Sequence, residues 1–340
     1  MTYHIVHDEC FTAIPAAEYR QLWQESGSPA FYHPGFLAAA ERFPMLPVIG
    51  THYLTAWKGT RLAAFLVAYQ QSQPDPFGTL AKSTGIVFSP PRGGLLGHVA
   101  HCYDSRILLR VGAEDAAGLL LTALADIAKE KAIPGCGLLN VTSGPLLAAA
   151  RQVGYHTAWM HDRFTIDLQG IGVFEEYIAS LPSNGRHEMR RQLRKFNASG
   201  GAVRTLRGED ADLAGVVALA QRTSAKNGTP DYYPCGIFEN FLTLCGDLIT
   251  VVQVEYQDTL VAGMICLNEP GCLHLWAGGA DYSYSEWSPY SIMVAAGVQH
   301  ALRSGVTRLE VGRTNARIKA RLGCKPLPLY AALWQQKEAS

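Results

Sequence analysis

The stretch EVGRTNARIKARLGCKPLPLY, residues 310–330, is the part of this chain on which the prediction of its fold most depends. It begins inside a short β-prone run, 308–311, and turns at Gly312. The basic segment that follows has room for a short helical turn, which Gly323 ends. Two prolines then keep the chain extended into a last apolar run, 329–334. The stretch therefore predicts a strand, a basic turn and a closing strand.

The basic turn places five cations close together: Arg313, Arg317, Lys319, Arg321 and Lys325. Cations at the end of a strand and on a helical turn are suited to a phosphate or to a developing oxyanion. A basic loop that only faces water is the alternative, because most runs of charge are solvated.

Length and composition indicate a soluble globular protein of two domains, because 340 residues with 48% hydrophobic content exceed what one small core needs. No apolar run approaches the roughly 18 residues of a membrane helix, so we expect no membrane insertion. The N-terminal MTYHIVHDECF has acidic and His residues where a signal peptide needs a basic start and an apolar core. The expected location is the cytoplasm.

The eight cysteines are scattered without a CxxC pair, which is typical of buried free thiols in a reducing compartment. No HExxH motif or tight His/Cys cluster appears, so the spacing supports no metal site. No Ser/His/Asp order or Cys/His pairing stands out either. A covalent acyl-enzyme is therefore not expected, although Cys324 beside Lys325 is the thiol to inspect.

The formal net charge is zero, but two windows, 186–207 and 303–325, are strongly basic. Each holds seven Lys or Arg residues against one acidic residue, so the rest of the chain is net negative. This distribution argues against a general nucleic-acid coat. It favours a local site for one phosphate-bearing partner.

Hydrophobic periodicity predicts an α/β (α+β) chain whose two halves echo each other. LAAFLVAY (62–69) and LVAGMICL (260–267) are each predicted as the second strand of a hairpin. Each half then has a helix before a short buried strand. These pairs are 113–131 with 138–141 in the first half and 289–304 with 308–311 in the second. Residues 71–112, which include PPRGGLLG (90–97), are expected to form a long functional loop with strand segments.

The second half adds three predicted helices, 183–199, 210–226 and 237–245, and a meander of strands, 249–256, 260–268 and 272–278. Two copies of one α/β unit explain the repeated order. We therefore predict an N-terminal domain, 1–168, and a C-terminal domain, 169–340.

This order of elements resembles the GNAT acyltransferase fold present twice, each copy a mixed, largely antiparallel sheet flanked by helices. LPSNGRHEMRRQLRKFNASGG (181–201) is similar to the basic helix that opens the second domain of FemAB-like proteins. LAQRTSAKNG (219–228) and AGGADYSYSEWSPYSIM (277–293) resemble their next helix and their strand, turn and Ser-Pro-started helix. The closing run, Gly-Arg, a Lys four residues before a Gly, then Pro-x-Pro-Leu-Tyr, resembles theirs. The resemblance covers about 165–335 and is weaker before it.

The resemblance implies an enzyme that moves an activated acyl group onto an amine. Fem-type members take an aminoacyl group from a charged tRNA and attach it to a peptidoglycan precursor or a small peptide-like metabolite. Other relatives use acyl-CoA donors or modify polysaccharides. The expected partners are thus an aminoacyl-tRNA donor and an amine of a small molecule, peptide or cell-wall precursor, with no further cofactor.

The donor is the point at which alternatives stay open. GNAT enzymes that use CoA generally hold its pyrophosphate in a Q/R-x-x-G-x-G/A turn before a helix. Before the helix at 289 this chain reads DYSYSEWSP, with no glycine, and PPRGGLLG does not lead directly into a helix. We therefore favour aminoacyl-tRNA over acyl-CoA. A non-catalytic module that binds a phosphate-rich ligand is the third hypothesis.

By resemblance to the Fem closing run, Lys319 is the predicted cationic stabiliser of the tetrahedral oxyanion, and a surface lysine is the alternative. Arg313 is the second predicted catalytic residue, as a clamp on phosphate or carboxylate. Its alternative is a salt bridge to a nearby acid.

The remaining candidates would bind the two substrates. Predicted phosphate or donor contacts are Arg186, Arg190 and Arg194 on one helical face, Arg191 and Lys195 on an adjacent face, and Arg317. Predicted acceptor-pocket residues are Asp231, Tyr232, Trp276, Asp281, Tyr282 and Tyr290. In that pocket Trp276 or Tyr282 would stack, and Asp231 or Asp281 would receive an amine proton. A solvated helical face and ordinary packing are the respective alternatives.

Overall fold

A computed structural model describes residues 2–75, 78–88, 91–142, 144–284 and 286–336. Pro90 and Ser285, which belong to two of the quoted motifs, lie outside the described residues. The chain forms two compact units. The first comprises Met1–His161 with Pro328–Ser340, and the second comprises Asp162–Leu327.

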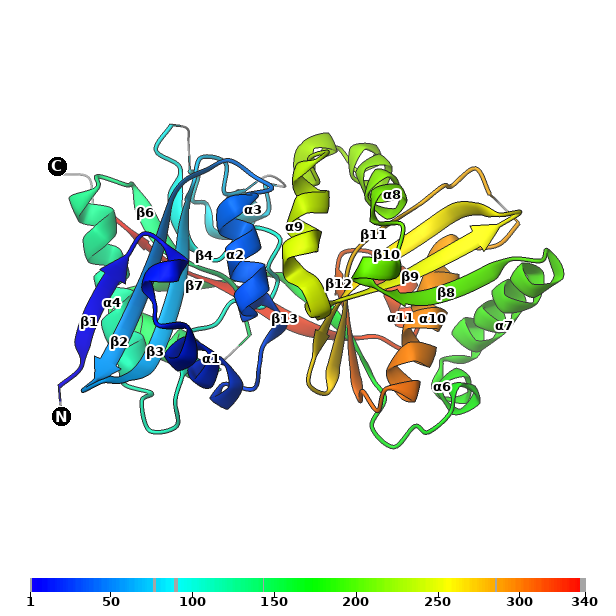
Figure 1. The fold of residues 1–340 in the computed structure, drawn as a ribbon, viewed down its shortest axis with the longest axis horizontal. Helices are drawn as coiled ribbons and strands as arrows, with labels where there is room; N and C mark the ends of the chain where they lie inside the picture. The colour runs from blue at the N-terminus through cyan, green and yellow to red at the C-terminus, as the bar shows by residue number, and fades with distance from the viewer. Residues whose placement is uncertain (1, 76–77, 89–90, 143, 285, 337–340) are drawn as a thin grey trace. The chain divides into compact units, whose positions relative to one another are not determined.

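The first unit begins with a strand and two helices, followed by a two-stranded hairpin and then by shorter strands and further helices (Figure 1). Its elements are β1 (His4–Asp8), α1 (Ala16–Glu25), α2 (Pro34–Arg42), β2 (Val48–Lys58), β3 (Arg61–Gln71), α3 (Thr79–Thr84), β4 (Gly94–Gly97), β5 (Leu108–Leu109), α4 (Ala116–Glu130), β6 (Gly135–Val141), α5 (Gly144–Gln152) and most of β13 (Lys325–Gln335).

The second unit repeats the pattern with longer helices. Its elements are the end of β7 (His156–Asp167), α6 (Phe174–Ser180), α7 (Ser183–Ala198), β8 (Ala202–Arg207), α8 (Leu213–Lys226), α9 (Ile237–Cys245), β9 (Ile249–Tyr256), β10 (Thr259–Glu269), β11 (Cys272–Ala280), α10 (Pro289–Arg303), β12 (Arg308–Arg313) and α11 (Ala316–Arg321).

Both units have the same strand arrangement. The first runs β1-β2-β3-β4-β6-β13 and the second runs β8-β9-β10-β11-β12-β7. In each, neighbouring strands are antiparallel except for one parallel pair, β4 with β6 and β11 with β12. This correspondence confirms the predicted repetition of one mixed, largely antiparallel unit.

The last strand of each unit comes from a different place in the chain than the sequence suggested. Residues 328–340 were assigned to the second domain, yet β13 pairs with β6, from Tyr330 opposite Val141 to Gln335 opposite Gly135. In the second unit, β7 takes the corresponding place beside β12. Periodicity predicts where a strand is, but not which partner it pairs with, so the predicted division at 168/169 differs from these units.

Helices cover both faces of the first unit's strands because alternate residues of the hairpin point to opposite sides. Leu54 and Leu66 join the core beneath α4. Phe65, one residue away, meets the ring of Tyr19 on α1 edge to face at 4.9 Å. Because helices cover both faces of these hairpin strands, the strands appear in the sequence as nearly continuous apolar runs.

The second unit has α8 and α9 on one side of its strands and α7, α10 and α11 on the other (Figure 1). Its α8 approaches β11 so closely that a Cβ on Gly279 would lie 2.0 Å from the carbonyl oxygen of Leu219. The AGGA segment of the sequence is therefore explained by helix–strand contact. On the opposite side, α10 begins at Pro289 after Ser288, whose Oγ accepts a hydrogen bond from the Ser291 amide.

Residues 71–112 were expected to form a long functional loop with strand segments, and one of these segments is an inner strand. β4 lies between β3 and β6 and is buried throughout. A Cβ on Gly97 would lie 2.2 Å from Cδ2 of Leu138, so any larger residue there would require the Leu138 side chain to move. A four-residue strand flanked by glycines has too few side chains to show a β period. Among the described helices, none combines the length and apolar character needed to cross a bilayer.

Candidate active site

The strands β11 and β12 of the second unit are paired only where they begin. Their parallel ladder runs from Cys272 opposite Arg308 to His274 opposite Glu310, although β12 continues to Arg313 and β11 to Ala280. The register of β12 with β7 also shifts after Glu310. Local departures from regular pairing re-aim side chains and are frequent beside active sites. The end of β12 is therefore a place where side chains can be presented to a substrate.

A left-handed turn connects the end of β12 to α11. Gly312, Thr314 and Asn315 have φ values of 71°, 66° and 55°. For the two non-glycine residues this conformation costs about 1–2 kcal/mol each. Such backbone strain collects where surrounding structure holds a functional geometry. The turn brings α11 back towards β12.

Lys319 on α11 points into the protein instead of into water. Its side chain is 3% exposed, and its Nζ donates a hydrogen bond to the main-chain carbonyl of Arg313. Nζ also lies 5.1 Å from the centroid of the Phe164 ring, within the range of a cation–π contact. The surface-lysine alternative is therefore excluded for this residue.

Burial lowers the pKa of Lys319 to about 8, and the positive charge of Arg313 adds to this effect. Near neutral pH such an amine carries its proton but can also give it up, which is the condition for proton transfer. The neighbouring Cys324 behaves differently, because burial raises the pKa of its thiol to about 12. Cys324 is thus held as a neutral thiol near neutral pH.

Arg313 extends from the same turn towards an aromatic group. Its Nη2 lies 3.5 Å from the hydroxyl of Tyr232, which belongs to a short 3-10 turn, Pro230–Tyr232, and is 8% exposed. The Tyr232 ring meets the Tyr233 ring at 4.9 Å, and Tyr233 stacks on Phe238 of α9 at 4.7 Å. Arg313 itself is only partly buried. Its guanidinium therefore remains accessible at the edge of this cluster.

The arginines of α7 do not act as one set. Arg190 and Arg194 line a groove of about 500 Å³ together with apolar residues of α6, α7, β8 and α10, and Arg190 lies 3.7 Å from Glu175. Arg191 is held by Glu188 at 2.7 Å on the outside of the helix. Arg186 reaches the carbonyl of Leu181 at 3.4 Å.

The other two predicted donor contacts, Lys195 and Arg317, are exposed. The N-terminal end of α7 packs directly on α11, since a Cβ on Gly185 would lie 1.9 Å from the Arg321 carbonyl.

The predicted acceptor-pocket residues are dispersed. Trp276 is 9% exposed and packs against the rings of Phe238 and Phe241 at 5.6 and 5.9 Å. Asp281 accepts hydrogen bonds from the amide and hydroxyl of Ser283 and lies 3.5 Å from Arg222, and these contacts lower its pKa, the Ser283 bonds first.

The other three acceptor candidates differ from one another in environment. Tyr282 is 48% exposed with the Lys226 ammonium 4.3 Å from its ring centroid. Asp231 is exposed, and Tyr290 is partly buried against the core of the second unit. Of the six predicted acceptor residues, the structure thus places Tyr232 against Arg313.

Three residues that sequence reasoning did not select lie on the strands next to Lys319 and Arg313. Phe164 supplies the ring beneath the ammonium, and Arg163 and Glu310 form a buried ion pair at 3.3 Å on the adjoining strands. Only pairing between β7 and β12 brings these residues together. The available signal was a single acidic residue, Glu310, inside an apolar strand.

Comparison with known proteins agrees with this architecture. Residues 183–320 match the family model described as acetyltransferase (GNAT) domain. The search of curated proteins gives no match. FemX is similar in structure, with 10% identity and a TM-score of 0.62 over 92% of this chain and 95% of that one.

Two further solved structures extend the comparison. A tandem GNAT protein from the clavulanic acid biosynthesis pathway has 12% identity and a TM-score of 0.60 over 100% of both chains. A conserved protein of unknown function from Bacteroides thetaiotaomicron has 8% identity and a TM-score of 0.57 over 98% of this chain and 100% of that one. The predicted fold, two GNAT-like domains in tandem, is confirmed.

Proposed function

We propose, from the premise that this chain has the tandem GNAT fold, that it forms an amide bond by moving an activated aminoacyl group onto an amine acceptor. The observation that carries the proposal is the buried Lys319 ammonium beside Arg313 at the end of β12. A lysine this well buried costs stability, and such a cost is common where a charged group takes part in chemistry.

The reaction needs little beyond positioning and electrostatics, because the ester of an aminoacyl-tRNA is already activated. The acceptor amine attacks the ester carbonyl, and a C–N bond forms as the carbonyl oxygen becomes an oxyanion. The Lys319 ammonium stabilises that oxyanion. The C–O bond to the tRNA then breaks, and the proton lost by the amine ends on the leaving hydroxyl. A lysine with a pKa of about 8 is suited to relay that proton.

Arg313 and the groove lined by Arg190 and Arg194 are proposed to hold the donor. Arg313 offers a partly buried guanidinium next to the reacting group, and such a fork binds phosphate or carboxylate through two hydrogen bonds. Arg190 and Arg194 offer exposed cations further along the unit. The chain has zero net charge, and recognition of only the acceptor end of a tRNA would require no more than such local basic patches.

Acyl-CoA is the second candidate donor. The tandem GNAT protein from the clavulanic acid biosynthesis pathway, which is 12% identical to this chain, is described as a structure without AcCoA. That description suggests AcCoA as a ligand of that protein. Against it, the segment that joins β11 to α10 contains no glycine, and the Ser288 hydroxyl accepts a hydrogen bond from the Ser291 amide in the first turn of the helix. A pyrophosphate cradle of the usual kind needs glycines and free amides at this place.

The donor is identified by incubating the purified chain with radiolabelled aminoacyl-tRNAs and, separately, with labelled acetyl-CoA, each with small amine and peptide acceptors. We expect labelled amide from one or a few aminoacyl-tRNAs and none from acetyl-CoA. Label from acetyl-CoA alone would replace the donor and leave the reaction class intact. Binding without turnover of either donor would instead favour a non-catalytic module for phosphate-rich ligands.

A further inference from the structure

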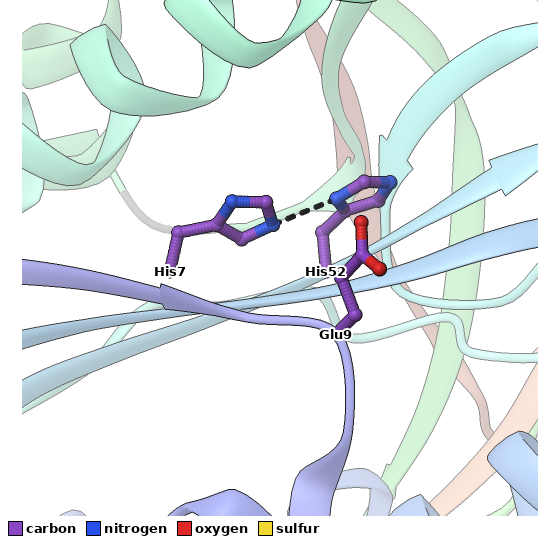
Figure 2. A group of neighbouring side chains, drawn as sticks. All are labelled: His7, Glu9 and His52. Atoms are coloured by element: carbon purple, nitrogen blue, oxygen red, sulfur yellow. Dashed lines mark hydrogen bonds between the residues drawn. The ribbon is translucent and has the colours of Figure 1, made fainter.

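The edge of the first unit holds a group of side chains that the proposed transferase does not use. His7 lies on β1, Glu9 follows that strand directly, and His52 lies on the neighbouring β2 (Figure 2). The register of β1 with β2 ends at Asp8 opposite Tyr53, so Glu9 comes next to His52. His7 and Glu9 are two residues apart and share a face. The three side chains therefore converge from two strands far apart in the sequence.

The distances within this group are those of a ligand set. Nε2 of His7 and Nδ1 of His52 are 2.9 Å apart, and the ligand atoms of all three residues lie within 4.8 Å of one another. Two nitrogens bound to one tetrahedral zinc ion lie about 3.3 Å apart, given Zn–N bonds of about 2.0–2.1 Å. Opening the His7–His52 hydrogen bond by a few tenths of an ångström, through rotation of the exposed His7, would admit the ion.

From this geometry we infer that His7, Glu9 and His52 form a binding site for a divalent transition-metal ion, for which Zn²⁺ is the natural probe. Two imidazoles and one carboxylate suit zinc and its neighbours, whereas Mg²⁺ and Ca²⁺ prefer an all-oxygen set. The sequence-based expectation of no metal site rested on the absence of ligands spaced closely along the chain. The pairing of β1 with β2 brings residues together that are distant in the sequence.

The surroundings prepare the histidines and the carboxylate for this role. His52 is 1% exposed, and burial, followed by the charge of His7, lowers its pKa to about 4. The main chain of Glu9 is fixed by a hydrogen bond from the Thr51 hydroxyl to its carbonyl. The ligands therefore need little ordering when the ion arrives.

Lys131 is the built-in competitor for the site. Its Nζ lies 3.0 Å from Oε1 of Glu9, and both side chains are largely exposed. A metal ion would take over this carboxylate and release the ammonium to water. A bound metal ion would therefore link β1, the edge strand of its unit, to β2 and stabilise their pairing.

The test measures Zn²⁺ binding to the full chain by competition with a chromophoric chelator, and Co²⁺ binding by its visible absorption. We expect one ion per chain and a rise in Tm with Zn²⁺ but none with Mg²⁺. His7→Ala and Glu9→Ala remove exposed ligands, so they should leave the fold intact. Each should weaken binding by at least the roughly 10- to 100-fold seen when an outer-shell partner is lost.

Two further variants make the result specific. His4→Ala removes an exposed histidine three residues earlier on β1, on the other face, and should bind Zn²⁺ as the unmodified chain does. Lys131→Met removes the competing ammonium and should bind Zn²⁺ more tightly. Failure of the unmodified chain to bind Zn²⁺ or Co²⁺, or equal binding by His7→Ala and His4→Ala, would overturn the proposal.

Discussion

Lys319 donates a hydrogen bond from its buried Nζ to the main-chain carbonyl of Arg313, six residues earlier. The bond closes the left-handed turn between β12 and α11 and leaves the Arg313 side chain free to extend towards Tyr232. Two cations are thereby held at one strand end, and each raises the electrostatic cost of the other. A negative charge bound between the two cations, such as a phosphate or a developing oxyanion, would offset this electrostatic cost. The cost is therefore offset only while such a charge is present.

The burial of Lys319 should make the free energy of unfolding depend on pH. Its pKa is about 8 in the folded protein against an ordinary value of 10.5, so the unfolded chain binds more protons between these pH values. Unfolding free energy contributed by this group therefore rises as pH increases from about 8 to 10.5, by on the order of 3 kcal/mol. Below pH 8 the buried ammonium is a net cost.

Lys319→Met removes that cost and should be more stable than the unmodified chain at pH 7, with an advantage that shrinks by pH 10. Urea unfolding of both proteins at the two pH values measures the difference and cancels all other titrations. Lys325→Met, a change at an exposed lysine, should show no such trend. An advantage of equal size at both pH values would mean that Lys319 is not desolvated.

Loss of the Arg313 guanidinium should act mainly on donor binding. Hydrogen bonds to charged groups contribute about 1.5–3 kcal/mol, so Arg313→Ala should raise the KM for the donor roughly 10- to 100-fold. Tyr232→Phe keeps the ring cluster and removes only the hydroxyl 3.5 Å from Arg313, so its effect should be much smaller. Equal effects of the two changes would point to local packing as the role of Arg313.

Salt dependence should separate the arginines of α7. Arg190→Gln with Arg194→Gln removes two cations of the groove and should lower the log–log salt slope of tRNA binding by about 1 to 2, because Glu175 lies 3.7 Å from Arg190. Arg191 is neutralised by Glu188 at 2.7 Å, so Arg191→Gln should change the slope little. A filter-binding titration at several salt concentrations measures both, and a slope unchanged in the double variant would remove this groove from donor binding.

The Arg163–Glu310 pair should be a strong determinant of folding. Both side chains are nearly fully buried, and removal of one partner from a buried pair typically costs about 3–5 kcal/mol. Glu310→Ala should lower unfolding free energy by that order. Glu255→Ala, which breaks the more exposed pair with Arg204, should cost less than about 1 kcal/mol. Denaturant unfolding of the two variants provides the comparison.

Local pattern was sufficient to predict most elements of the second unit. The Pro289 start of α10, the strand at 308–311 and the helix stop near Gly323 all follow from backbone preferences that act within a few residues. The position of strand β4 within residues 71–112 was not predicted, because a four-residue strand with a glycine at each end shows no period of its own. Nor was the pairing of β13 with β6, which depends on partners distant in the chain.

The residues of the candidate site also fall into those that the sequence predicted and those that it did not. Lys319 and Arg313 were selected because a resemblance marked their short segment, and the structure places them in contact. Phe164, whose ring lies near the Lys319 ammonium, was not selected, because local pattern does not show that β7 lies beside β12. Trp276 was one candidate for a ligand-stacking ring, with packing as the alternative, and the structure packs it against Phe238 and Phe241 of α9. His7, Glu9 and His52 were not singled out either, because only the pairing of β1 with β2 brings them together.

The single-turnover rate of amide formation, measured against pH for the unmodified chain and Lys319→Ala, tests the central claim most directly. With the active donor in excess, the ammonium role predicts a rate that falls as pH rises through about 8, because that is the pKa of Lys319. Lys319→Ala should lose roughly 10²- to 10³-fold at pH 7 and lack that fall. Lys325→Ala, at an exposed position in the same basic segment, should match the unmodified chain. A Lys319→Ala protein with an unaltered rate and pH profile would contradict the account.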